Sequence, residues 1–147
     1  MTTVLAVDLG SASGRVLAGT LTDGRLDVTD IHRFKHEARR RQDGTLTWDV
    51  ATMEAETIIG LKKALEQFPD ARSVSIDTWG VDWAPVDENG DLVGDVIAYR
   101  DERTSRTLDA FHERIGDREF FDLTGNQPAT INTANQLFAY LQENPAD

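Results

Sequence analysis

The residues best suited to chemistry lie near the start of the chain, where an apolar run meets a carboxylate and a turn of small residues. Four successive apolar residues at 4–7 predict a strand buried on both faces, and Asp8 follows them. A buried strand gains nothing from ending in a charge, so Asp8 indicates a chemical role. Gly10 and Gly14 are expected to adopt backbone conformations closed to other residues and to let main-chain N–H groups approach an anion. The segment predicts a site for ATP phosphates and a metal ion.

The turn differs from the common nucleotide-binding loops. Ser11 and Ser13 add hydroxyl donors, but residues 15–21 form a second strand pattern and not a helix. Neither a Walker loop nor a Rossmann fingerprint is present. An ordinary hairpin with a Gly/Ser turn explains this segment equally well when it is taken alone.

Further elements must position this turn. Residues 3–9, 15–21 and 25–34 predict an antiparallel meander of three strands. Asp49 is a suitable N-cap for a helix that Pro69 ends. The elements expected after it are a buried strand at 73–77, an extended segment at 92–98, a helix at 104–115 that stops at Gly116, and a helix at 133–142.

Composition narrows the class of protein. The 147 residues favour one compact domain, and the net charge of -11 opposes binding to nucleic acid or to an anionic membrane. The absence of cysteine excludes disulfides and thiol catalysis. No signal pattern and no membrane-spanning run is present, so a cytoplasmic location is expected.

The order of three strands, helix, strand and helix is that of ribonuclease H-like and actin-like ATPase domains, an α/β class with a mixed sheet. In such a sheet the strand at 73–77 can lie parallel to the first, which brings Asp8 and Asp77 to one edge. Two neighbouring carboxylates favour Mg²⁺ held largely through water. The alternative for Asp77 is a helix or turn cap.

Several motifs make the resemblance more specific. They lie at residues 6–15, 31–34, 47–49, 76–82, 98–104 and 132–133. In this order they resemble the amino-terminal domain of the FGGY carbohydrate kinases, and especially the branch that phosphorylates L-rhamnulose. The combination of Asp-Thr-Trp-Gly-Val-Asp with Tyr-Arg-Asp-x-Arg-Thr is far more restrictive than the first motif.

The resemblance implies that ATP and Mg²⁺ serve phosphoryl transfer to a ketose, giving L-rhamnulose 1-phosphate. Xylulose, fuculose, gluconate and glycerol remain alternative acceptors. The positions that match the ATP-phosphate turn are Ser11, Ala12, Ser13, Gly14 and Arg15. Asp8 matches the carboxylate near the metal and the transferring phosphoryl group, and Gly80 matches a position that contacts sugar.

Two further pairs have a structural alternative. Asp101 and Arg103 match residues on the sugar side of the family's cleft, but a helix cap and a surface ion pair explain them as well. Trp79 and Trp83 could offer apolar faces to a sugar, although packing in the core is the favoured interpretation.

One expected group is missing. The family's proton acceptor is an Asp between His and Thr, and no His-Asp-Thr occurs in the chain. We therefore expect residues 1–147 to be an incomplete N-terminal kinase domain without the second ATPase domain. Ketose-dependent ADP release should not exceed that of a Gly14→Ala control.

Two rival functions remain at this stage. A ribonuclease H-like nuclease would need further acids near Asp8 and Asp77, for which Glu54 or Glu56 could serve. A non-catalytic nucleotide-binding module of the actin type would have no use for the motif at 98–104.

Overall fold

The computed structural model describes residues 1–145 and divides the chain into two compact units. The sheet unit comprises Met1–Arg39 and Trp48–Gly80, and the helical unit comprises Arg40–Thr47 and the residues from Val81 onward. The sequence predicted one compact domain, and the chain comprises these two compact units. The units are described one at a time.

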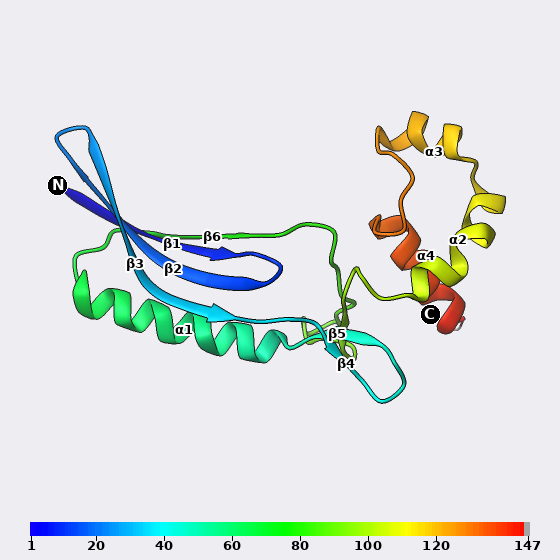
Figure 1. The fold of residues 1–147 in the computed structure, drawn as a ribbon, viewed down its shortest axis with the longest axis horizontal. Helices are drawn as coiled ribbons and strands as arrows, with labels where there is room; N and C mark the ends of the chain where they lie inside the picture. Colours follow the sequence, from blue (N-terminus) through cyan, green and yellow to red (C-terminus); the bar gives the residue numbers. More distant parts are fainter. Residues whose placement is uncertain (146–147) are drawn as a thin grey trace. The chain divides into compact units, whose positions relative to one another are not determined.

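The sheet unit contains the predicted meander and the predicted parallel strand. Its strands are β1 (Thr2–Leu9), β2 (Ser13–Thr22), β3 (Arg25–Lys35) and β6 (Val74–Thr78), in the order β3-β2-β1-β6. β2 pairs antiparallel with β1 and β3, whereas β6 pairs parallel with β1. The sheet is mixed, as the sequence predicted, and α1 (Val50–Gln67) lies along one face of it (Figure 1).

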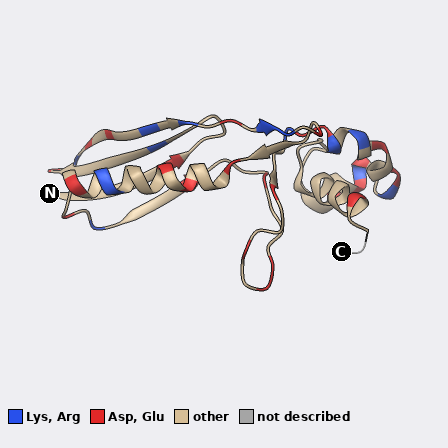
Figure 2. Ribbon diagram, turned by 90° about the horizontal axis from the view of Figure 1, so that it is seen from below, with Lys and Arg blue, Asp and Glu red and all other residues tan. Residues whose placement is uncertain are grey.

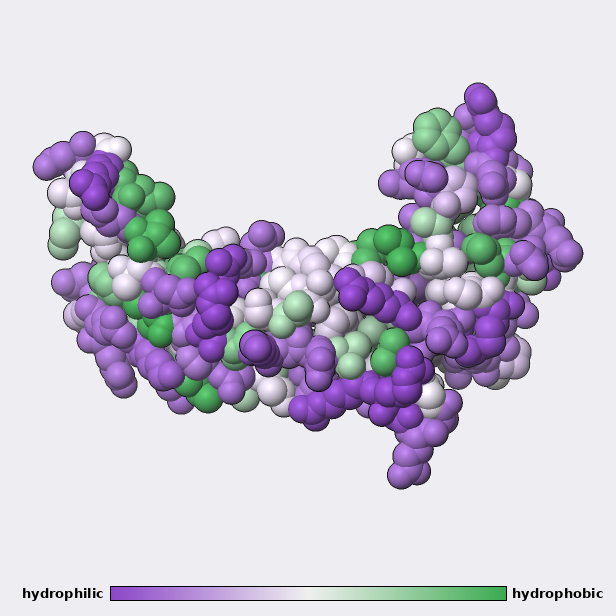
Figure 3. All heavy atoms as spheres, in the orientation of Figure 1, coloured by the Kyte–Doolittle hydropathy of each residue, from purple (hydrophilic) through white to green (hydrophobic). Residues whose placement is uncertain are grey.

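Burial in β1 corrects one expectation. Leu5 and Val7 are buried in a cluster with Val16 and with Ala64 of α1, whereas Val4 is 40% exposed. Alternate residues of a strand point to opposite faces, so β1 is buried on one face and not on both. Exposed apolar side chains also gather along the β2–β3 hairpin (Figure 3).

β6 is an edge strand. Its predicted position is correct, but the prediction that it is buried is wrong, because Val74 is 52% exposed and Ile76 is 60% exposed. In the described part of the chain, β6 has a neighbouring strand on one side alone.

A glycine allows α1 to lie close to the sheet. A Cβ atom at Gly60 would lie 2.4 Å from Cγ2 of Val16 and 3.1 Å from Cβ of His32.

The helix α1 begins where Asp49 accepts a hydrogen bond from the Thr52 N–H at 2.9 Å, as expected for an N-cap. Glu56 and His32 form a second link between α1 and β3, with 2.7 Å between Oε2 and Nε2.

The helical unit is built from α2 (Arg103–Arg114), α3 (Asp117–Thr124) and α4 (Thr133–Glu143), together with most of a small sheet. That sheet has the order β4-β5-β7, from β4 (Arg39–Arg40), β5 (Leu46–Trp48) and β7 (Val96–Ile97). The extended segment expected at 92–98 thus forms a strand over two of its residues, and Leu92 makes an isolated bridge to Val86.

Aromatic packing joins the helices of this unit. α2 packs on α4, and the ring of Phe111 contacts those of Phe120 and Phe138. The sequence did not predict α3. Gly116, expected as the stop of α2, instead provides the N-cap of α3, and Gly125 ends α3 in the left-handed conformation.

The loop before β7 is strongly acidic. Figure 2 shows Asp and Glu but no Lys or Arg along residues 81–95. Asp87 accepts hydrogen bonds from the N–H groups of Asp91 and Asn89, which lower the pKa of its carboxyl group.

Among the described helices, none combines the length and apolarity that crossing a bilayer requires.

Candidate functional site

The turn between β1 and β2 presents main-chain donors. The N–H of Gly10 donates to the carbonyl of Ser13 at 3.0 Å and closes the turn. Within residues 1–145, the N–H groups of Ser11 and Ala12 have no hydrogen-bond partner. Two such donors at the tip of a tight turn are suited to binding an anion.

The turn glycines do not have the special backbone conformations that the sequence predicted. Neither Gly10 nor Gly14 adopts a positive φ, so neither is required for a left-handed conformation. A Cβ at Gly14 would lie 2.2 Å from Cζ of Phe34. Gly14 is needed because the buried ring of Phe34 occupies the space of its side chain.

Arg15 is paired with Asp8. The two residues are opposite each other in the β1–β2 register, and Nε of Arg15 lies 3.0 Å from Oδ2 of Asp8. Their side chains keep 39% and 36% of their accessible surface. The guanidinium therefore neutralises Asp8 in this structure, and it stays accessible to an anion at the turn.

Asp77 lies beside Asp8. The parallel register of β1 and β6 pairs these two positions, as the sequence predicted, and both side chains fall on the sheet face opposite α1. Within the described residues, no group of three or more acidic or histidine ligands could hold a metal ion. Two adjacent carboxylates nevertheless fit Mg²⁺, which binds one or two carboxylates and completes its shell with water and phosphate oxygens.

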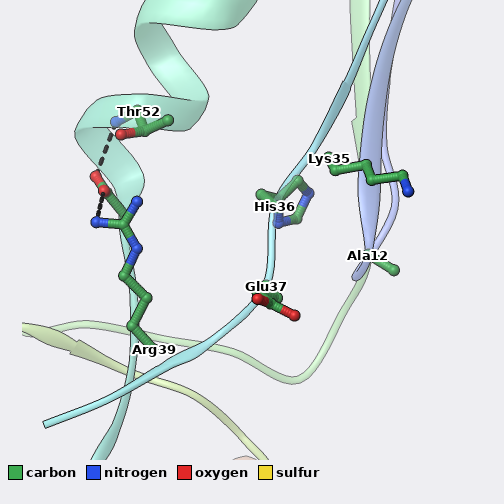
Figure 4. Close-up of a pocket in the computed structure, with 7 residues that line it drawn as sticks. Ala12, Lys35, His36, Glu37, Arg39 and Thr52 are labelled. Carbon is green, nitrogen blue, oxygen red and sulfur yellow. Dashed lines mark hydrogen bonds and ion pairs between the residues drawn. The ribbon is translucent and has the colours of Figure 1, made fainter.

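A cavity of about 350 Å³ adjoins the turn. It lies between the end of β3 and the start of α1 (Figure 4). Its lining residues are Ala12, Lys35, His36, Glu37, Arg39, Asp49 and Thr52. The pair of Arg39 and Asp49, 2.7 Å apart, closes the side next to the helix.

Gly80 follows β6 and is open to a ligand. A Cβ at Gly80 would meet no atom within 4 Å. The preceding N–H, that of Trp79, donates to the carbonyl of Leu9 at 3.1 Å and extends the pairing of β6 with β1. This bond places the Gly80 main chain close to the end of the strand that carries Asp8.

The two tryptophans pack against other rings. Trp79 contacts Trp48 at 5.0 Å and His36 at 5.6 Å between ring centroids. Trp83, in the helical unit, lies edge-on to Tyr140 at 5.4 Å. These contacts agree with the favoured interpretation that both side chains pack within the protein.

Asp101 and Arg103 are buried, with 7% and 3% of their surface exposed. The Asp101 carboxylate accepts hydrogen bonds from the N–H of Leu46 at 2.7 Å and from the N–H of Arg103 at 2.9 Å. Burial lowers the pKa of Arg103, and the charges of Glu143, Asp101 and Asp82 oppose this shift. Asp101 thus holds the main chain at the start of α2, in agreement with the cap that was the alternative expected. The surface ion pair of that alternative is wrong, because both residues are buried.

Two polar residues have partners that the sequence did not identify, although a structural role was the favoured interpretation of His36. Oδ1 of Asp82 accepts a hydrogen bond from the N–H of Tyr99 at 2.7 Å, which closes the acidic loop. His36 lies between the turn and Trp79, and its position could have been inferred because His32, Phe34 and His36 alternate along one strand face. No signal in the sequence indicates the partner of Asp82.

Comparison with known proteins agrees with this arrangement. The chain is 39% identical over 145 residues to a rhamnulokinase of Mannheimia succiniciproducens, covering 97% of the chain and 30% of the relative. It is 38% identical over 133 residues to a rhamnulokinase of Bacillus subtilis, covering 90% of the chain and 27% of the relative. The chain thus spans less than a third of the length of these curated relatives.

Solved structures establish the fold. A xylulose kinase from Rhodospirillum rubrum matches with a TM-score of 0.80 at 17% identity, over 98% of this chain and 30% of that one. A gluconate kinase from Lactobacillus acidophilus matches with a TM-score of 0.79 at 10% identity, over 99% of this chain and 29% of that one. The predicted actin-like ATPase fold is confirmed.

The match to a family description covers almost the whole chain, from residue 3 to residue 147. That description is of the FGGY family of carbohydrate kinases, N-terminal domain. It agrees with the motifs, with the topology and with the curated relatives. The chain therefore belongs to the FGGY family of carbohydrate kinases and carries the sequence of its N-terminal domain.

Proposed function

We propose that the protein to which this chain belongs transfers the γ-phosphoryl group of ATP to the primary hydroxyl of L-rhamnulose. The observation that carries the proposal is the 37–40% identity to four curated rhamnulokinases along nearly the whole chain. Because the chain spans less than a third of those proteins, the activity is proposed for the complete kinase. A cytoplasmic location is part of the same proposal.

The turn and its charged neighbours form the phosphate side of the site. ATP supplies the phosphoryl group, and Mg²⁺ reduces the charge of its phosphates. The N–H groups of Ser11 and Ala12 bind phosphate oxygens, with the hydroxyls of Ser11 and Ser13 as further donors. Arg15 is shared between Asp8 and the phosphates. Asp8 and Asp77 hold the metal, largely through water.

The family resemblance assigns Gly80, Asp101 and Arg103 to the sugar side. Gly80 offers its main chain to a sugar hydroxyl, since no side chain stands in the way. Asp101 and Arg103 contribute by holding the local structure, because the Asp101 carboxylate already accepts two main-chain N–H groups. Xylulose, fuculose, gluconate and glycerol remain the alternative acceptors.

The nuclease alternative has little support. It required Glu54 or Glu56 near Asp8 and Asp77, but Glu56 pairs with His32 on the side of α1. The two aspartates are on the opposite face of the sheet. A non-catalytic nucleotide-binding module is distinguished by the absence of any ketose-dependent turnover.

The test is an ADP-release assay on the protein encoded by the complete reading frame, with ATP, Mg²⁺ and each candidate acceptor. We expect turnover with L-rhamnulose, and we expect Asp8→Asn to lower kcat about 100-fold, the effect of losing one major electrostatic contact. Asp30→Asn is the matched control, because Asp30 is an exposed carboxylate in the same sheet, paired with Arg33.

Two outcomes would overturn the proposal. One is a wild-type protein that releases no ADP in response to L-rhamnulose, and the other is an Asp8→Asn variant as active as the control. The isolated 147-residue chain is expected to show no ketose-dependent ADP release above that of Gly14→Ala, because the general base is absent from its sequence.

A further inference from the structure

We propose that His36 is a positioning residue that holds the phosphate turn and the Trp79–Gly80 main chain at a fixed separation. His36 immediately follows β3 and contacts both segments. Its consequence for catalysis rests on the proposed kinase function, whereas the mechanical link between the two segments does not.

The main chain of His36 provides the first contact. Its N–H donates to the carbonyl of Ala12 at 3.3 Å. Ala12 is at the tip of the turn, next to the unpartnered N–H of Ser11. This bond ties the tip of the turn to the end of β3, so a movement of His36 alters the direction of the donors that face a phosphate.

The ring of His36 provides the second contact. It stacks on the ring of Trp79 with 5.6 Å between centroids and 29° between planes. It also meets Trp48 edge-on at 5.7 Å and Phe34 at 6.0 Å. Gly80 follows Trp79 directly, so this aromatic cluster determines where the proposed sugar contact lies.

The surroundings of the two ring nitrogen atoms indicate which interactions hold the His36 side chain in place. Nδ1 and Nε2 are both buried and have no hydrogen-bond partner within the described residues. Most buried polar atoms in proteins do have one. The side chain therefore holds its position by stacking and not by hydrogen bonds, and a phenyl ring at this position should do the same.

The first test measures amide hydrogen exchange on the protein encoded by the complete reading frame. Because the Gly10 and Trp79 N–H groups are hydrogen-bonded at the two segments, they report on each. We expect His36→Ala to accelerate exchange at both by about tenfold or more, and His36→Phe to restore both. Leu61→Ala is the control, since Leu61 packs from α1 on the apolar core of the sheet unit, a cluster that does not include His36.

Two exchange results would overturn the proposal. Acceleration at one amide alone would show that the segments are not linked through His36. Equal acceleration in Leu61→Ala would show that any loss of core packing has the same effect.

The second test measures steady-state kinetics of the complete kinase. Misplacing reacting groups by about 1 Å costs up to roughly 100-fold in rate, so we expect His36→Ala to lower kcat more than tenfold with little change in either KM. His36→Phe should recover kcat. If both variants instead raise KM for the ketose, the nitrogen atoms contact the sugar and the positioning role is wrong.

The two proposals can fail separately. A wild-type kinase without ketose turnover would overturn the proposed function, and the exchange experiment would still decide the role of His36. An active wild type with normal kcat in His36→Ala would overturn the positioning role and leave the function intact.

Discussion

The two units of the chain use polar residues in opposite ways. In the sheet unit the buried core is largely apolar, and α1 approaches the strands closely at Gly60. In the helical unit, buried polar side chains bond to main-chain groups. These are Asp101, Thr104, Asn135 and Gln136, each no more than 7% exposed.

The difference bears on which residues are available for ligands. In the sheet unit, apolar packing stabilises the fold, which leaves Asp8, Arg15 and the turn accessible. In the helical unit, polar groups are occupied in folding. Gln136, for example, donates through Nε2 to the carbonyls of Val81 and Ile131 at 2.8 and 2.9 Å. A motif that matches the family can thus consist of accessible side chains in one unit and of buried, structural side chains in the other.

Asp101→Ala should have the largest effect on stability. The substitution leaves two main-chain N–H groups without an acceptor and removes a carboxylate near the buried Arg103. We expect a loss of about 3–5 kcal/mol in the free energy of unfolding, measured by urea denaturation. Asp95→Ala is the control, because its exposed pair with Arg41 contributes about 0–1 kcal/mol. Equal losses in the two variants would contradict the structural role.

Gly60→Ala tests the close packing of the sheet unit. The added methyl group would overlap Cγ2 of Val16, and the expected loss is about 2–3 kcal/mol in the free energy of unfolding. Gly19→Ala is the matched control, since its methyl would meet its nearest atom, Cδ1 of Leu26, at 3.4 Å. If thermal or urea denaturation shows the same change for both, close packing at Gly60 is not important.

Gly14→Ala should cost less, about 1–2 kcal/mol, because the ring of Phe34 can shift in part. A double-mutant cycle distinguishes the packing of Gly14 against Phe34 from any effect of Gly14 on the backbone conformation. In a Phe34→Leu background the added methyl has more room, so the cost of Gly14→Ala should fall. An unchanged cost would mean that Gly14 is required for some other reason.

The smallest effect concerns the N-cap of α1. The hydrogen bond from the Thr52 N–H, assisted by Arg39, lowers the pKa of the Asp49 carboxyl below its ordinary value of 3.8. A lowered folded-state pKa contributes stability that is present above the unfolded value and is lost as the pH falls through the folded value. Wild type should therefore lose more stability than Asp49→Asn between pH 6 and pH 3, as measured by urea denaturation. Parallel losses would contradict this assignment.

Local patterns accounted for much of the architecture. Apolar runs and turn residues predicted β1, β2 and β3, and the helical spacing after Asp49 predicted α1. The order of elements predicted the parallel pairing that places Asp77 beside Asp8. The helix α3 was missed because it is short and its only buried residue is Phe120, so it has little periodic apolar pattern.

The candidate site also has features that the sequence determined and features that it did not. The sequence alone determined the type of turn, the aspartates beside it and the family, because these depend on residue identity and spacing along the chain. Only the tertiary structure decided that Phe34 is the reason for Gly14, that Asp101 serves the main chain, and that His36 joins the turn to Trp79. Each of these depends on contacts between residues distant in sequence, and local periodicity does not specify which side chains will meet.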